Sequence, residues 1–206
     1  MTKEEMVKKL ANRTPSIFGE EQLRKYGILL PIVKKDEDYH ILFEVRSKNL
    51  KKQPGEICFP GGAVDKTDPN PQYSAIRETS EELGISVSQI DHVYPLDVIV
   101  SSFGNRIIYP FVGFLKDNIK FHPNPDEVDH VFTAPINELK RMEPLCYNVQ
   151  SQIVPEENFP FHLINGGRNY KWHTQTIHEY FYFYKDYCIW GLTANILRHF
   201  LNIIDV

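Results

Sequence analysis

The sequence predicts an α/β fold in which a mixed sheet is covered by helices. Strand-like apolar runs recur along the chain, a helical pattern at 74–83 lies between two of them, and an amphipathic helical pattern follows the last one. The 206 residues contain no repeat and no low-complexity linker, and this length suits one domain. We therefore expect a single domain over residues 1–206, with a short N-terminal helix and a C-terminal helix appended.

The first part of the chain predicts a short helix, a hairpin and a further short strand. Thr2 and Glu5 have the spacing of a capping box at the start of a helix. An apolar run at 28–33 and an alternating stretch at 39–46 flank a charged turn, so we expect two paired strands. Proline and glycine pairs then enclose a short strand at 57–59.

Helices and strands continue to alternate in the rest of the chain. The helix at 74–83 is followed by Gly84, at the place where a glycine in the left-handed conformation ends a helix. Thr193 has the position of an N-cap for the final helix. The other expected elements are strands at 93–100, 107–115 and 177–184 and a short helix or turn at 136–142.

Composition limits the partners that the chain can have. The net charge of −4 gives no long-range attraction to DNA or to an anionic membrane. Three widely separated cysteines support neither a disulfide framework nor a CxxC metal site, and they fit a reducing compartment. No stretch approaches the roughly 20 apolar residues that span a membrane, and the N-terminal residues lack the apolar core of a signal peptide. We expect a cytoplasmic protein without nucleic-acid or membrane partners, and the choice between a monomer and a homodimer stays open.

Three glutamates share one face of the predicted helix at 74–83. Glu78, Glu81 and Glu82 stand at positions i, i+3 and i+4, which lie within about one turn of a helix with about 3.6 residues per turn. Like charges at this spacing repel, and a hard divalent cation reverses that penalty by taking their oxygens as ligands. By spacing alone, a solvated acidic face is the favoured explanation, because acidic clusters are usually ordinary surface.

The residues around these glutamates favour a metal site. Residues 77–85 read Arg-Glu-Thr-Ser-Glu-Glu-Leu-Gly-Ile, which resembles the end of the Nudix box, Arg-Glu-apolar-x-Glu-Glu-x-Gly-apolar. Upstream, Gly62 is followed after five residues by Asp68, where the box has Glu, and eight residues rather than seven then lead to Arg77. The resemblance, over about 62–85, implies an α/β/α sandwich with a mixed sheet and a loop-helix-loop metal site.

The resemblance also implies roles for these side chains. Glu78 and Glu82 would bind Mg²⁺ or Mn²⁺, with Glu81 as a third ligand, and the metal would activate a water for attack on phosphorus. Glu78 or Glu81 would act as the general base, with Glu127 as a candidate from a loop. Arg77 belongs to the catalytic set of the box, and we expect it to anchor Asp68 or a neighbouring carboxylate rather than to contact substrate.

The segment upstream of the box points to a substrate. Residues 41–62 resemble the signature of the coenzyme A pyrophosphatases among Nudix hydrolases, Leu-Leu-Thr-x-Arg-Ser, a basic Leu-Arg segment and Gly-x-x-x-Phe-Pro-Gly-Gly, and residues 191–195 resemble a later segment of the same proteins. Glu44 stands where the signature has Thr, and Lys51 where it has Arg. The resemblance implies cleavage of coenzyme A or its thioesters into 3′,5′-ADP and 4′-phosphopantetheine or its acyl form.

The charges of this segment suit that substrate. Coenzyme A carries a 3′-phosphate, and Arg46, Lys48, Lys51 and Lys52 form a local basic patch that can bind it, although a solubilising loop explains the lysines as well. Gly61 and Gly62 permit close approach of backbone and phosphate. Two alternatives remain: a Nudix hydrolase acting on ADP-ribose, a nucleotide sugar or a dinucleotide polyphosphate, and a non-catalytic nucleotide sensor.

Overall fold

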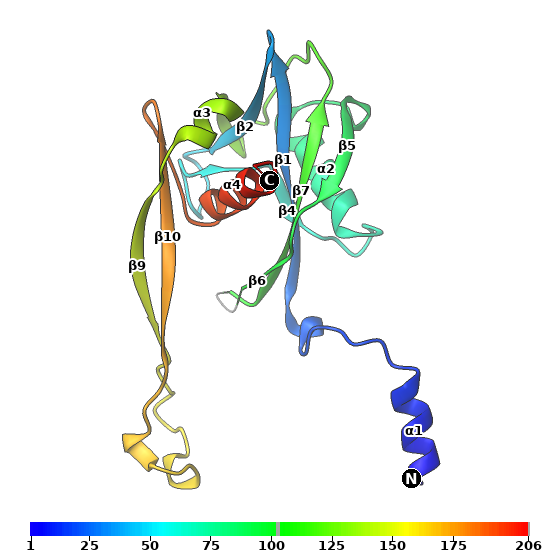
Figure 1. Ribbon diagram of the computed structural model, residues 1–206, viewed down its shortest axis with the longest axis vertical. Coiled ribbons are helices and arrows are strands. Elements are labelled where there is room, and N and C mark those ends of the chain that lie inside the picture. The colour runs from blue at the N-terminus through cyan, green and yellow to red at the C-terminus, as the bar shows by residue number, and fades with distance from the viewer. Residues whose placement is uncertain (102–103, 206) are drawn as a thin grey trace.

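The computed structural model describes residues 1–101 and 104–205, and its centre is a mixed sheet with a helix on each face (Figure 1). The described strands of this sheet are β1 (Arg24–Lys35), β2 (Asp38–Arg46), β3 (Ile57–Cys58), β4 (Gly61–Ala63), β5 (Ile90–Pro95), β6 (Ile99–Ser101), β7 (Arg106–Leu115) and β8 (Val128–Pro135). A second, three-stranded sheet contains β9 (Leu145–Gln152), β10 (Thr174–Tyr184) and β11 (Tyr187–Trp190). The helices are α1 (Lys3–Ala11), α2 (Pro71–Leu83), α3 (Ile136–Arg141) and α4 (Gly191–Ile203), and short 3₁₀ turns lie at Glu20–Gln22, Val87–Gln89, Phe161–Leu163 and Gly167–Asn169.

Strand β1 organises the larger sheet. It pairs antiparallel with β2 through the expected hairpin and parallel with β7, giving the order β3-β2-β1-β7-β5. Alternate residues of β1 face opposite sides: Leu29 packs with the helix residue Ala75 on the α2 side, whereas Leu30 and Ile32 pack with Leu197 on the α4 side. The expected α/β/α sandwich is therefore confirmed.

Strand β2 lies inside the sheet, with β8 along one edge and β1 and then β3 along the other, and its central residues are covered on both faces. Every residue from Ile41 to Val45 is buried, including the charged Glu44. Leu42 joins an apolar cluster with Leu83 of α2, and Phe43 joins the cluster on the α4 side. The side chain of Glu44 therefore lies on the same face as Leu42, toward α2.

Several predicted boundaries change in the structure. The stretch expected as one strand at 93–100 forms parts of two strands, β5 and β6, which both pair with β7. Helix α2 begins at Pro71 instead of 74, because Asn70 caps it through a hydrogen bond from the Tyr73 N–H to its side-chain oxygen. Thr193 does not cap α4, which begins after Trp190. The hydroxyl of Thr193 donates to the Ile57 carbonyl instead.

Other expectations about local structure are confirmed, and some elements were not anticipated. The capping box at Thr2 and Glu5 is present, although α1 buries none of its residues and lies away from the sheet in Figure 1. Strands β8, β9 and β11 had no prediction, and the β9–β10 hairpin extends from the body as a long ribbon (Figure 1). None of the described helices is both long enough and apolar enough to cross a membrane.

Candidate functional site

Helix α2 is held against β1 by close backbone packing. Gly27 of β1 lies so near the Pro71 carbonyl that a Cβ at position 27 would overlap it. At the other end, Gly84 has φ 60° and closes the helix as expected, and its backbone lies against the carbonyl of His122. The N–H of His122 donates to the Leu83 carbonyl. The helix that carries the glutamates therefore has both ends placed by neighbouring backbone.

The glycines of β4 contact two of the predicted metal ligands. Strand β4 pairs with β1, which brings Gly61 and Gly62 beside α2. The Gly61 N–H donates to Oε2 of Glu82 at 2.8 Å. A Cβ at position 62 would overlap the Glu78 carboxyl group, so only glycine leaves room for that carboxylate in its observed position. The glycine loop and the acidic helix thus form one site.

Arg77 ties the loop to the helix. Its Nε and Nη2 donate to the two carboxylate oxygens of Asp68 at 3.2 and 3.0 Å, which is the anchor that the sequence led us to expect. The same guanidinium lies 2.9 Å from Glu78, 3.2 Å from Glu81 and 3.6 Å from the exposed Asp65. Hydrogen bonding to Arg77 lowers the pKa of Asp68. Arg77 therefore acts in this structure as a bridge among carboxylates.

The three helix glutamates have different surroundings. Glu81 is exposed and pairs with Arg77, whereas Glu82 is buried and Glu78 is partly buried. Burial raises the pKa of Glu82 to about 8, with Glu78 and Glu127 contributing in the same direction and the Gly61 N–H opposing them. Burial also raises the pKa of Glu78, and Arg77 opposes that effect. Glu78 and Glu82 therefore lie in the interior of the site, and Glu81 lies at its exposed edge.

A loop from a distant part of the chain brings Glu127 to the same place. The N–H of Asn124 donates to the Glu82 carbonyl at 2.9 Å, and the Ser47 N–H donates to the Glu127 carbonyl at 2.8 Å. Glu127 is exposed, and its charge contributes to the raised pKa values of Glu78 and Glu82. The structure therefore joins the loop candidate Glu127 to the helix glutamates.

The predicted substrate-binding residues are divided between two positions. Arg46 ends β2, is partly buried, and opposes the raised pKa of Glu82 by its charge. Lys51 and Lys52 lie exposed in the loop between β2 and β3, together with Lys48. Within 1–101 and 104–205, neither Lys51 nor Lys52 forms an ion pair with the helix glutamates. Their charges remain exposed to solvent on the loop that follows Arg46.

Glu44 is a member of this site that sequence reasoning noted only as a departure from a signature. Its side chain is 1% exposed, and burial together with the charge of Glu82 raises its pKa well above the usual range. The signal in the sequence that could have identified Glu44 as a site residue is its acidic side chain within an otherwise apolar run of β2. The depth of Glu44 depends on neighbours in β3 and β8, where it pairs with Cys58 and Val131, and the sequence did not predict strand β8. We use the term acidic cluster for Glu44, Glu78, Glu82 and Glu127.

The donor chemistry of the acidic cluster fits a hard divalent cation. In the described part of the chain, no group of three His, Cys, Asp or Glu side chains is placed closely enough to hold a metal ion as the side chains stand. Among the described residues, Oε1 of Glu44 is nevertheless buried without a hydrogen-bond partner, and burial together with neighbouring like charges raises the pKa of Glu44 and Glu82. Carboxylate oxygens are the ligands that Mg²⁺ and Mn²⁺ prefer. A cation would balance this charge.

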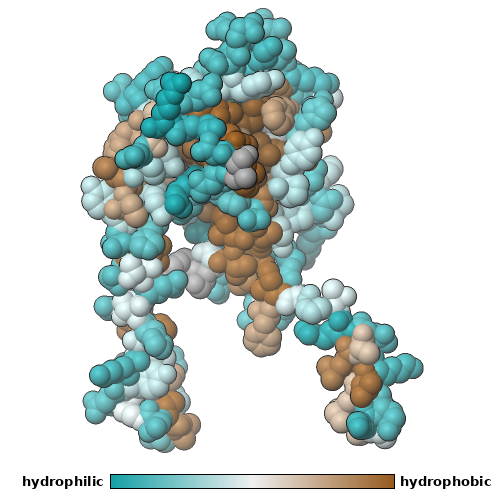
Figure 2. Space-filling view, in the orientation of Figure 1, coloured by the Kyte–Doolittle hydropathy of each residue, from teal (hydrophilic) through white to brown (hydrophobic). Residues whose placement is uncertain are grey.

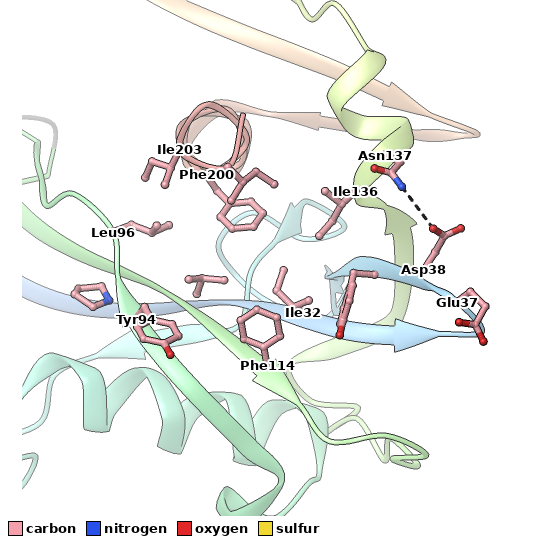
Figure 3. Close-up of a pocket in the computed structure, with 14 residues that line it drawn as sticks. Ile32, Glu37, Asp38, Tyr94, Leu96, Phe114, Ile136, Asn137, Phe200 and Ile203 are labelled. Carbon is pink, nitrogen blue, oxygen red and sulfur yellow. Dashed lines mark hydrogen bonds between the residues drawn. The ribbon is translucent and has the colours of Figure 1, made fainter. Parts of the chain in front are cut away.

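A large apolar cavity lies on the other face of the sheet. Its volume is about 760 Å³, and Figure 3 shows Leu96, Phe114, Phe200 and Ile203 among its lining. Phe200 belongs to the apolar cluster on the α4 side, Leu96 and Phe114 pack against that cluster, and the apolar surface at the centre of Figure 2 follows the same region. The cavity is therefore separated from the acidic cluster by the sheet and is not part of this site.

The fold and the site together define a class: an α/β/α protein whose acidic helix and glycine loop can hold a divalent cation beside a diphosphate. A family model described as the NUDIX domain matches residues 25–155. The chain belongs to the Nudix family, and it is a pyrophosphohydrolase of that family.

Curated relatives support this assignment. A peroxisomal coenzyme A diphosphatase, NUDT7, of Mus musculus is 38% identical over 113 residues, which are 55% of this chain and 48% of that protein. The match therefore spans about half the length of the mouse relative. An uncharacterized Nudix hydrolase, NudL, of Photorhabdus laumondii is 30% identical over 183 residues, 89% of this chain and 86% of its own. Among solved structures, a MutT/nudix family protein from Enterococcus faecalis aligns with 100% of this chain and 70% of its own, with 13% identity and a TM-score of 0.48.

Proposed function

We propose that this chain hydrolyses the diphosphate of coenzyme A or of its thioesters, releasing 3′,5′-ADP and 4′-phosphopantetheine or its acyl form. The main support is a contact between the two segments that resemble coenzyme A pyrophosphatases. The hydroxyl of Thr193, in segment 191–195, donates to the carbonyl of Ile57, in segment 41–62, at 3.0 Å. The mouse relative, which carries the name coenzyme A diphosphatase, supports the same substrate.

The acidic cluster can perform this reaction with a bound cation. Glu78 and Glu82 would hold Mg²⁺ or Mn²⁺, and the cation would supply positive charge to the diphosphate oxygens and lower the pKa of a bound water. The Gly61 N–H orients the carboxylate of Glu82, and Gly62 leaves space for that of Glu78. Water then adds to one phosphorus while the bridging P–O bond breaks, so that each product keeps one phosphate of the former diphosphate.

We assign the proton acceptor to Glu127. Glu78 and Glu82 are committed to the cation in this scheme, and Glu81 is paired with Arg77 at 3.2 Å. Glu127 is exposed, lies on a loop beside the site, and forms no ion pair within the described residues. A general base contributes about 10²- to 10⁴-fold to rate. Glu127→Gln should therefore lower kcat by that order, whereas Glu81→Gln should lower it much less; the reverse order would exclude Glu127.

The substrate is tested with purified protein, coenzyme A and Mg²⁺ or Mn²⁺, with products resolved by mass. Dephospho-coenzyme A and ADP-ribose serve as competing substrates, and Glu82→Gln serves as the inactive control. We expect 3′,5′-ADP from coenzyme A, and none from the control. Cleavage of ADP-ribose with coenzyme A left intact would refute the substrate, and binding without cleavage of any diphosphate would favour the nucleotide sensor.

The role of the basic loop is tested separately. If Lys51 and Lys52 bind the 3′-phosphate, replacing both with alanine should lower kcat/KM for coenzyme A by about tenfold or more, since a hydrogen bond to a charged group is worth about 1.5–3 kcal/mol. The activity toward dephospho-coenzyme A should change little. Lys34 and Lys35, exposed at the β1–β2 turn, provide a matched control pair. Equal losses for both substrates would exclude a phosphate contact.

A further inference from the structure

Glu44 is an acidic side chain buried in the sheet without an adequate partner among the described residues. It is 1% exposed, and within 1–101 and 104–205 its Oε1 has no hydrogen-bond partner. Its Oε2 has the thiol of Cys58 at 4.0 Å, and a thiol is a weak donor. An ionised carboxylate is costly to bury, so Glu44 keeps a proton unless a positive charge takes the place of that proton.

The direction of the side chain limits what that partner can be. Residues alternate along β2, and Leu42 packs with α2 while Phe43 packs on the α4 side, so Glu44 is directed toward α2. On that side, Glu44 is paired with Cys58 of β3, and Gly61, three residues further along the chain, donates its N–H to the carboxylate of Glu82 at 2.8 Å. The carboxyl group of Glu44 therefore lies on the same side of the sheet as that of Glu82, beside the segment that holds it.

Arg46 is the alternative partner, because it lies two residues further along β2, after a shift of register between Val45 and Arg46, and carries a positive charge. The described structure has no ion pair between Arg46 and Glu44, and the Nε of Arg46 is itself buried without a partner. Arg46 also remains the residue expected to contact substrate phosphate. The charge of Arg46 offsets that of Glu44 in part, but among the described residues Oε1 of Glu44 is left without a hydrogen-bond partner.

We propose that Glu44 is a direct ligand of a divalent cation bound between β2 and α2, so that the sheet adds a carboxylate to those of Glu78 and Glu82. The cation would be a hard, oxygen-preferring ion such as Mg²⁺ or Mn²⁺. This inference rests on the cation site of the proposed function and assigns to it a residue outside the helix and loop of the box. A threonine at this position, as in the signature, would offer a neutral hydroxyl instead of a charged ligand.

The test is a titration of the full-length protein with Mn²⁺ alone, followed by calorimetry and by the EPR signal of free Mn²⁺. Glu44→Gln keeps the shape of the side chain and removes its charge, and Glu44→Thr supplies the residue of the signature. Loss of a residue that merely supports a metal ligand costs about 10- to 100-fold in affinity, so we expect each variant to raise the Mn²⁺ Kd by at least about tenfold. Glu37→Gln, at the exposed β1–β2 turn, should leave the Kd unchanged.

The outcomes separate this inference from the proposed substrate. Circular dichroism of the metal-free variants first shows whether they are folded, and we expect both to be, because neither replacement introduces a charge at the buried position. An unchanged Mn²⁺ Kd in both variants would overturn the inference. If the Kd is unchanged and only the KM for substrate rises, Glu44 positions Arg46 and does not bind the cation. A raised Kd in a protein that leaves coenzyme A intact would retain the metal ligand and refute the substrate.

Discussion

The stability of the metal-free protein should fall as the pH rises from about 5 to about 8.5. Burial raises the pKa of Glu82 from 4.5 to about 8, so the folded protein keeps a proton on Glu82 over a range in which the unfolded chain has lost it. The folded state binds more protons than the unfolded state in this window. The stabilising contribution is therefore complete below the unfolded pKa and is lost as the pH rises through the folded one.

The size of the effect follows from the two pKa values. Each pKa unit corresponds to about 1.36 kcal/mol of unfolding free energy. The change in the pKa of Glu82 from 4.5 to about 8 therefore limits the loss of unfolding free energy to about 5 kcal/mol. Glu44 acts in the same direction, because burial also raises its pKa. His40 acts in the opposite direction, because burial lowers its pKa and the folded state then favours the neutral ring. The difference between wild type and Glu82→Gln isolates the contribution of Glu82.

The assay is urea unfolding in EDTA at several pH values between 5 and 8.5, followed by circular dichroism. Wild type should lose stability with rising pH, and Glu82→Gln should lose less, because the amide does not titrate. Adding Mn²⁺ at the higher pH should restore stability to the wild type, since the cation then balances the charge in place of the proton. A flat or rising wild-type profile in EDTA, or the same slope in Glu82→Gln, would refute the reasoning.

Further predictions follow from the contacts around the site. Gly62→Ala should keep the melting temperature within a few degrees, because the new Cβ displaces only the flexible carboxyl group of Glu78. It should lower Mn²⁺ affinity and kcat about 10- to 100-fold. A large loss of stability with normal activity would contradict this prediction. Gly27→Ala should instead unfold or severely destabilise the protein, since its Cβ meets the Pro71 backbone, and thermal melting measures the effect. Arg77→Lys should weaken Mn²⁺ binding about tenfold, because lysine cannot replace the two hydrogen bonds to Asp68, and wild-type affinity would exclude a positioning role. Thr193→Val should cost about 1 kcal/mol in urea unfolding through loss of the bond to Ile57, and an unchanged midpoint would show that this bond contributes nothing.

Local sequence patterns predicted the helix of the site well. The positions of Glu78 and Glu82 within one turn, and of Gly84 at its end, depend only on helix geometry and on the left-handed conformation that glycine adopts easily. The predicted start of the helix is three residues too late, because the helical pattern of the sequence begins at 74, whereas the Asn70 cap and Pro71 begin the helix at 71. Thr193 illustrates the opposite error, since its hydroxyl bonds to a distant carbonyl rather than to its own helix.

The sequence by itself determined the α/β class, the Nudix family through the residues of the box, and the charge pattern on the α2 face. The tertiary structure decided which further groups meet that face. Strand pairing buries Glu44, and the hydrogen bond from Asn124 to the end of α2 brings the loop with Glu127 to the cluster. These arrangements join residues distant in sequence, and no local pattern encodes them, because the burial of a strand residue depends on which strands and helices lie on both sides of it.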